Sequence, residues 1–199
     1  MLRVTYHQWK LHKETLIMTK TAFILEQGNG IATVEEVKEL EQRIFREARI
    51  LDDEHYEDWF DMMTEDIHYF MPGIETRYRK DKTDQLNDTS RMAYYNDNKE
   101  EIKKRLARLE TGTAWSEDPA TRYCHLITNV EVETTDNPDE YLVYSNFLVY
   151  RNRVERDEDT LIGSRKDIWR REEGVLKLAK RRIVLKQSVL ISKNMNVYF

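Results

Sequence analysis

The sequence predicts an α+β fold in which helices come first and a meander of long antiparallel strands follows. Within residues 33–63 and 98–109, apolar residues recur at helical spacing. Beyond Pro119 the pattern changes to alternation, in segments rich in valine, tyrosine and phenylalanine. Because helices that precede an antiparallel meander pack on one face of its sheet, we expect a helical layer against a curved sheet.

The composition is typical of one globular domain. The chain has 199 residues, of which 40% are hydrophobic and 35% charged. Cys124 is the single cysteine, so the sequence excludes an intrachain disulfide framework and favours a reducing, cytoplasmic location. We expect residues 1–32 to be a weakly structured N-terminal extension and residues 33–199 to form the domain.

The charge balance argues against nucleic-acid and membrane partners. The 32 Lys and Arg residues against 37 Asp and Glu give a net charge of −5, whereas nucleic-acid-binding domains are usually basic. No run of apolar residues approaches the roughly 18 that a membrane-spanning helix needs. Polar residues also interrupt any signal-peptide core within residues 1–20.

The first helix is predicted over residues 34–51. Thr33 followed by Glu36 forms the pattern of a capping box. The apolar positions after it are spaced by 3, 3, 4, 4 and 3 residues: Val34, Val37, Leu40, Ile44, Ala48 and Leu51. This spacing is typical of an amphipathic helix.

A second helix and a first strand are predicted next. Asp52 and Asp53 are candidates to cap this helix, whose apolar face holds Tyr56, Trp59, Phe60 and Met63. The apolar run 67–71, closed by Pro72, indicates a strand.

A polar loop and a third helix follow. Residues 76–91 are almost wholly polar and show no periodicity, which indicates a long loop. Residues 98–109 are predicted to be helical, with Ile102, Leu106 and Leu109 as a narrow apolar stripe.

Four strands complete the predicted sheet. In the first, Leu126, Thr128, Val130 and Val132 alternate with polar residues, and the others are expected over residues 141–153, 160–170 and 175–191. Their turns are expected at residues 136–139, 157–159 and 172–174. The alternation breaks between Lys180 and Val184, where we expect a β-bulge or a strong bend.

The histidines and the cysteine give little support for catalysis. No two of the five histidines have a spacing that places them on one metal ion. His68 lies in the strand at residues 67–71, and we interpret it as a strand histidine with a hydrogen-bond partner. Cys124 and His125 are adjacent in a strand and therefore point to opposite faces, so they do not form a nucleophile–base pair.

Charged clusters have two readings each. The acidic residues between Asp52 and Asp66 offer candidates for a general acid or base, but we favour the interpretation as solvated carboxylates around helix starts. Five arginines fall on successive strands, and they indicate either subunit-interface ion pairs or solvated strand edges: Arg151, Arg153, Arg165, Arg170 and Arg171.

Ordered blocks of the sequence resemble the small, or β, subunit of aromatic-ring-hydroxylating dioxygenases, in the biphenyl, toluene and naphthalene dioxygenase group. The resemblance covers roughly residues 34–199. Its blocks are IFREA at 44–48, Leu51-Asp52, Trp59, DIHYFMP at 66–72, WSEDP at 115–119, Arg122 with 125–130, YRNR at 150–153 with Glu155, Gly163 with Arg165, Asp167 and Arg170, and 193–199. Where relatives tend to carry arginine before the histidine, this chain has Cys124, which we expect to weaken an intersubunit contact there.

The resemblance implies a cystatin-like, nuclear-transport-factor-like cone that assembles with a catalytic α subunit as three α and three β chains, with the β chains forming a trimer. It implies a structural role in the degradation of aromatic hydrocarbons, without catalytic residues in this chain. The Rieske [2Fe-2S] cluster and mononuclear Fe(II) are expected in the α subunit, through which ferredoxin and reductase act. One cysteine cannot ligate a Rieske centre, which agrees with this expectation. The candidate subunit-interface residues are Trp115, Arg122, His125, Arg151, Arg153 and Arg165.

A second hypothesis belongs to a different class of protein. Cones of this fold also enclose pockets that act as isomerases or dehydratases, and His68, Asp66 and Tyr69 are the residues that such a pocket would use here.

Overall fold

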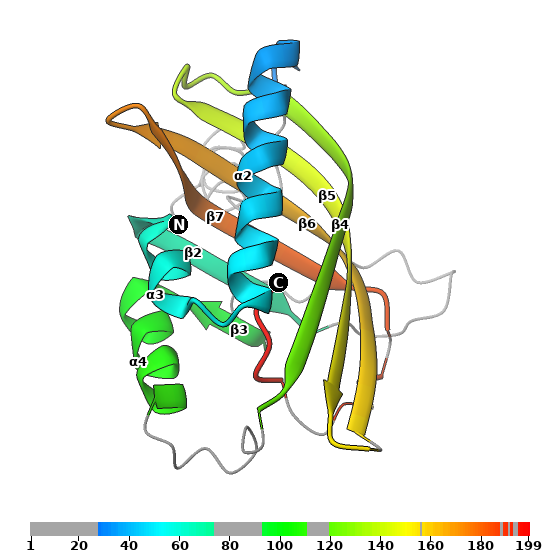
Figure 1. Ribbon diagram of the computed structural model, residues 1–199. Helices are drawn as coiled ribbons and strands as arrows, with labels where there is room; N and C mark the ends of the chain where they lie inside the picture. Colours follow the sequence, from blue (N-terminus) through cyan, green and yellow to red (C-terminus); the bar gives the residue numbers. More distant parts are fainter. Residues whose placement is uncertain are drawn as a thin grey trace, which may run out of the picture.

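The structure, a computed structural model, describes residues 28–73, 93–110, 120–155, 157–187, 189–190, 192 and 195–199. These residues form three helices and one seven-stranded sheet (Figure 1). In chain order the elements are β1 (Gly30–Ile31), α2 (Val34–Asp52), α3 (Tyr56–Asp61), β2 (Met63–Pro72), β3 (Ala93–Asp97), α4 (Lys99–Glu110), β4 (Arg122–Thr134), β5 (Glu140–Arg153), β6 (Asp157–Glu172) and β7 (Val175–Leu185).

The sheet has the strand order β1-β4-β5-β6-β7-β2-β3. Neighbouring strands are antiparallel except β2 and β7, which are parallel. Helix α2 crosses one face of the twisted sheet, α3 and α4 lie together near one end, and the C-terminal residues run between helices and sheet (Figure 1). The predicted α+β fold, with helices on one face of a mostly antiparallel sheet, is confirmed. No helix in the described ranges is long and apolar enough to cross a membrane.

Helix α2 begins at the predicted capping box. The Thr33 side chain accepts a hydrogen bond from the Glu36 amide, and the Glu36 carboxylate accepts one from the Thr33 amide. Leu40, Ile44 and Leu51 are buried as expected, but Val34 is 80% exposed because it precedes the part of the helix that meets the sheet. The buried stripe also contains a carboxylate, Glu47.

The predicted cap of the second helix is wrong. His55 occupies the N-cap of α3 and makes no side-chain capping bond. Asp52 is still the last residue of α2, and its carboxylate binds His125 instead. Strand β2 is longer than the predicted run 67–71, and β3 was not predicted. The predicted loop 76–91 lies outside the described residues.

Helix α4 agrees with the prediction for residues 98–109. The Asn98 side chain accepts a hydrogen bond from the Glu101 amide at 3.0 Å and so starts the helix. Ile102 and Leu106 are buried against the core.

Strand β4 contains a bulge that the sequence alternation did not reveal. Its register against β5 shifts between Thr128 and Glu131, and Asn129 has a positive φ of 53°. An extra residue exchanges the two faces of a strand. As a result Val132 is buried as expected, whereas Leu126 is 57% exposed and His125 takes the inward position.

Of the two turns that flank β6, one lies earlier than expected and the other lies where it was predicted. Asp157 already pairs with Arg153 across the β5–β6 hairpin, so the turn precedes residues 157–159. The β6–β7 turn falls within the predicted 172–174, where Glu173 and Gly174 have positive φ values of 50° and 81°.

Strand β7 ends at Leu185 rather than at 191. Its register against β6 shifts where Ile168 pairs with Lys180 and Trp169 with Leu178, so the irregularity lies just before the predicted interval 180–184.

Candidate functional site

Four buried charged side chains meet under α2 and form the ion-pair cluster: Glu47, Arg165, Asp167 and Arg181. Glu47 comes from α2, whereas the other three come from β6 and β7, in which Asp167 and Arg181 are register partners. The Arg181 guanidinium binds the Asp167 carboxylate at 2.8 and 2.9 Å and the Glu47 carboxylate at 2.6 and 2.9 Å. One arginine therefore ties the helix to the sheet.

The charges of the cluster stabilise one another. Burial alone would raise the pKa of Glu47, but the guanidinium groups of Arg181 and Arg165 outweigh it and lower that pKa to about 2. Burial would lower the pKa of Arg181, but the two carboxylates raise it well above its ordinary value. Burial lowers the pKa of Arg165, and the neighbouring Arg181 charge adds to this effect.

Arg165 is the least well paired member of the cluster. Its Nη1 lies 3.6 Å from a Glu47 oxygen, its Nε donates to Ser145 Oγ at 3.3 Å, and its Nη2 has no hydrogen-bond partner among the described residues. This buried N–H group retains the capacity to bind another acceptor.

A second buried group joins α2, β4 and the chain end. The carboxylate of Asp52 lies 2.6 Å from His125 Nδ1, and His125 Nε2 lies 2.8 Å from the main-chain oxygen of Tyr198. Both ring nitrogens of this buried histidine are engaged, so neither is free to exchange a proton with a substrate.

The C-terminal segment, residues 195–199, fills the interior between the helices and the sheet. The Tyr198 ring packs 4.4 Å from the Trp59 ring, and the Phe199 ring packs 5.1 Å from Phe147, measured between centroids. The Phe199 amide donates to the Tyr69 hydroxyl at 2.8 Å. Its main-chain oxygen accepts from Arg181 Nη1 at 2.6 Å.

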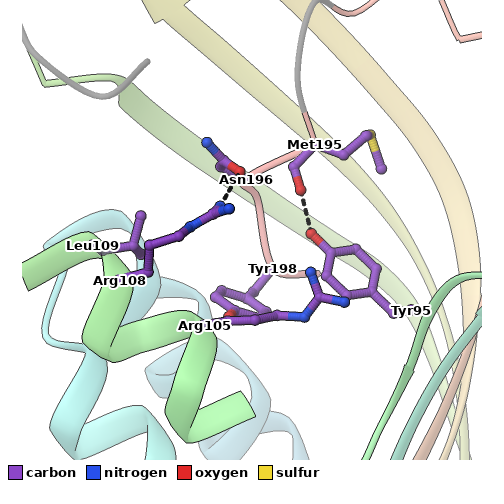
Figure 2. A pocket seen from close by; sticks show the side chains of 7 residues that line it. All are labelled: Tyr95, Arg105, Arg108, Leu109, Met195, Asn196 and Tyr198. Atoms are coloured by element: carbon purple, nitrogen blue, oxygen red, sulfur yellow. Dashed lines mark hydrogen bonds between the residues drawn. The ribbon is translucent and has the colours of Figure 1, made fainter. Parts of the chain in front are cut away.

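The start of this segment is held by β3 and α4, as Figure 2 shows. The Tyr95 hydroxyl donates to the main-chain oxygens of Met195 and Val197. Arg108 Nη2 donates to the Asn196 side chain at 3.1 Å. The cleft left around these residues measures about 10 Å³, close to the space of one water molecule.

The predicted interface residues have different environments. Arg151 is buried and pairs within the chain, with Asp159 at 2.7 Å, and Arg165 and His125 are also buried. Arg122 is exposed and Arg153 is half-buried, both at strand ends. Trp115 lies outside the described residues.

The three residues proposed for a pocket enzyme do not converge. His68 is half-exposed and bonds the Asn96 side chain at 2.8 Å, which agrees with its interpretation as a strand histidine with a partner. The Asp66 carboxylate is paired with Arg170 at 2.8 Å, whereas Tyr69 points into the core. Cys124 is exposed and His125 buried, so the prediction that they face opposite ways is confirmed.

Sequence reasoning missed that Glu47, Asp167 and Arg181 act together. A signal was present, because Glu47 stands in the apolar stripe of its helix between Ile44 and Leu51. Within the described ranges, no three His, Cys, Asp or Glu side chains gather in a way that could hold a metal ion.

The comparisons with known proteins identify the family. The model of the ring hydroxylating beta subunit family matches residues 46–192. The chain is 41% identical to the biphenyl 2,3-dioxygenase subunit beta of Rhodococcus jostii (strain RHA1), over 81% of this chain and 87% of that protein. It is 37% identical to the benzene 1,2-dioxygenase subunit beta of Pseudomonas putida (strain F1), with the same coverage.

The fold comparison agrees with this result. A solved structure of naphthalene 1,2-dioxygenase with indole bound in the active site contains a chain that superposes with a TM-score of 0.78, at 23% identity and over 100% of both chains. At that identity the likeness shows the fold alone. The family match and the 41% identity carry the assignment: this chain belongs to the ring hydroxylating beta subunit family.

Proposed function

We propose that this chain is the non-catalytic, structural β subunit of a multicomponent Rieske non-haem iron dioxygenase that hydroxylates aromatic hydrocarbons in the cytoplasm. Three copies form a trimeric core that orients three catalytic α subunits. The α subunits hold the Rieske cluster and the mononuclear Fe(II), and ferredoxin and reductase act through them.

The occupied interior is the observation that supports a structural role. A cone-shaped domain needs an open cavity to act on a small molecule. Here Tyr198 and Phe199 occupy the space beside Trp59 and Phe147, and the histidine in that region has both nitrogens engaged. This filled interior favours an assembly module over a pocket enzyme.

The candidate interface residues divide into two groups under this proposal. Arg122 is exposed and Arg153 is half-buried, at the ends of β4 and β5, and under this proposal they contact another subunit directly. His125, Arg151 and Arg165 are buried in their own chain, so they would support assembly by fixing the shape of the surface.

Co-expression with the large subunit tests the proposal. We expect the chain purified alone to contain no iron, and the chain purified with its α subunit to elute as a complex of three α and three β chains. His68→Ala is the key variant, because the pocket-enzyme hypothesis makes this side chain catalytic. We expect unchanged turnover per assembled complex, measured by product formation and normalised to complex mass and iron content. A loss of turnover above about tenfold in a complex of normal composition would contradict the structural role.

A further inference from the structure

The C-terminal segment is held as a bound peptide would be held. Residues 195–199 belong to no helix or strand, yet Val197, Tyr198 and Phe199 are at most 5% exposed. Their hydrogen bonds run to side chains of five other elements: Tyr69, Tyr95, Arg108, His125 and Arg181. In the described residues no strand pairs with the segment, so its departure would break side-chain contacts but no pairing between strands.

The position of Phe199 has the chemistry of a ligand site. Its ring lies against Phe147, and its main-chain oxygen accepts from the Arg181 guanidinium at 2.6 Å and from the Tyr69 hydroxyl at 3.3 Å. An apolar wall beside a buried guanidinium is suited to an aromatic ring that carries a carboxylate.

An unsatisfied donor strengthens this reading. Arg165 is buried and shares a Glu47 oxygen with Arg181: its Nη1 lies 3.6 Å from the oxygen that Arg181 Nη2 binds at 2.9 Å. Its Nη2 has no hydrogen-bond partner among the described residues. A carboxylate carries two acceptor oxygens, so besides the acceptor for Arg181 it brings a second one to this pair of arginines.

We propose that this interior is a binding site for a monocyclic aromatic carboxylate, and that residues 195–199 are its resident occupant. The segment undocks while the rest of the domain stays folded, and a small aromatic acid then competes for the position of Phe199. This adds a binding site to the structural role and does not depend on assembly with other subunits.

Tyr95 offers a way to weaken docking without removing a ring from the core. Its hydroxyl donates to two main-chain oxygens of the segment. In Tyr95→Phe the ring packing stays and these bonds are lost, which we expect to raise the undocked population about tenfold. Tyr150→Phe is the matched control, because the Tyr150 hydroxyl bonds Glu158 on the exposed side of the β5–β6 hairpin.

Native-state hydrogen exchange on the full chain, followed by mass spectrometry, measures the undocking. We expect amides of residues 197–199 to exchange faster than those of β5 and β6, through an opening that is insensitive to low denaturant concentrations. Tyr95→Phe should speed this exchange about tenfold, and Tyr150→Phe should leave it unchanged. Protection of the segment equal to that of β5 in both variants would overturn the proposal.

Competition then tests the site itself, with phenylacetate as the probe. Millimolar phenylacetate should increase deuterium uptake at residues 197–199 of Tyr95→Phe, and benzylamine, which carries the opposite charge, should not. Should Tyr95→Phe fail to fold, Phe199→Ala replaces it, and phenylacetate should raise its melting temperature more than that of Phe70→Ala, a core deletion on the same scale. Equal effects of both probes, or none, would refute a carboxylate site.

Discussion

Glu47 connects three elements of the structure through a single carboxylate. Glu47 lies on α2, and its carboxylate accepts one hydrogen bond from Trp59 Nε1 on α3 at 3.0 Å and two from Arg181 on β7. Removing a carboxylate from a buried cation leaves part of the cation's charge uncompensated. The resulting loss of stability is larger than the net contribution of the ion pair itself.

The first prediction concerns the removal of this charge. Glu47→Gln keeps the shape of the side chain but leaves Arg181 with one carboxylate, and we expect a loss of about 3 kcal/mol in the free energy of unfolding at pH 7. Glu57→Gln, on the exposed face of α3, should change it by less than about 0.5 kcal/mol. Urea denaturation followed by circular dichroism measures both; equal midpoints for the two variants would contradict the role assigned to the cluster.

The pH dependence of stability follows from the same residue. The arginines hold the pKa of Glu47 at about 2 in the folded protein, against an ordinary value of 4.5, so the unfolded state binds more protons between these pH values. The stabilisation is complete above about pH 4.5 and is lost as the pH falls toward 2. We therefore expect the difference in unfolding free energy between wild type and Glu47→Gln to shrink steadily as the pH falls from about 4.5 toward 2 in the same urea titrations. A difference that stays constant over this range would show that the folded-state pKa is not depressed.

At the scale of elements, local patterns predicted helices better than strands. The capping box at Thr33 and the apolar stripe of α4 are properties of neighbouring residues, and both are present as predicted. The bulge at Asn129 depends on how β4 twists against β5, which no local alternation records. Local sequence patterns also could not predict that Glu47 pairs with Arg181, because Arg181 lies 134 residues further along the chain.

The capping box gives a prediction at this scale. Thr33→Ala removes the acceptor for the Glu36 amide, and we expect a loss of about 1 kcal/mol in the free energy of unfolding. Thr33→Ser retains the hydroxyl and should stay within about 0.3 kcal/mol of the wild type. Chemical denaturation of the three proteins, fitted with one common dependence of the unfolding free energy on denaturant concentration, makes the comparison. A Ser variant as unstable as the Ala variant would assign the loss to the methyl group of Thr33 instead.

For the whole molecule, the resemblance of sequence blocks predicted the family, which hydrophobic periodicity could not. The ordered blocks at residues 44–48, 66–72 and 150–153 predicted membership of a subunit family, which the comparisons bear out. Composition and spacing alone ended at a single α+β domain. The first two blocks meet at the chain end: Glu47 from the first binds Arg181, which binds Phe199, and Tyr69 from the second binds Phe199 directly.

Assembly with other subunits tests whether the arginines at the strand ends form interface ion pairs. Arg153 is half-buried at the end of β5, directly across the hairpin from Asp157. If another subunit covers this end of the sheet, truncation of Arg153 leaves its partner carboxylate in the interface partly buried and unpaired. This costs about 2 to 5 kcal/mol in the free energy of association. A pair that stays solvated contributes only about 0 to 1 kcal/mol and is screened by salt.

Arg153→Ala should therefore leave the isolated chain folded by circular dichroism and weaken its association with the large subunit by about 30-fold or more, measured by size-exclusion chromatography over a dilution series. Lys38→Ala is the control, because it removes the same charge from a residue that is exposed on α2. A buried interface pair loses affinity at both low and high ionic strength, whereas general charge attraction weakens with salt for both variants alike. Unchanged association of Arg153→Ala under both conditions would place this arginine in solvent and move the search for the interface to Arg122 and to the other end of the sheet.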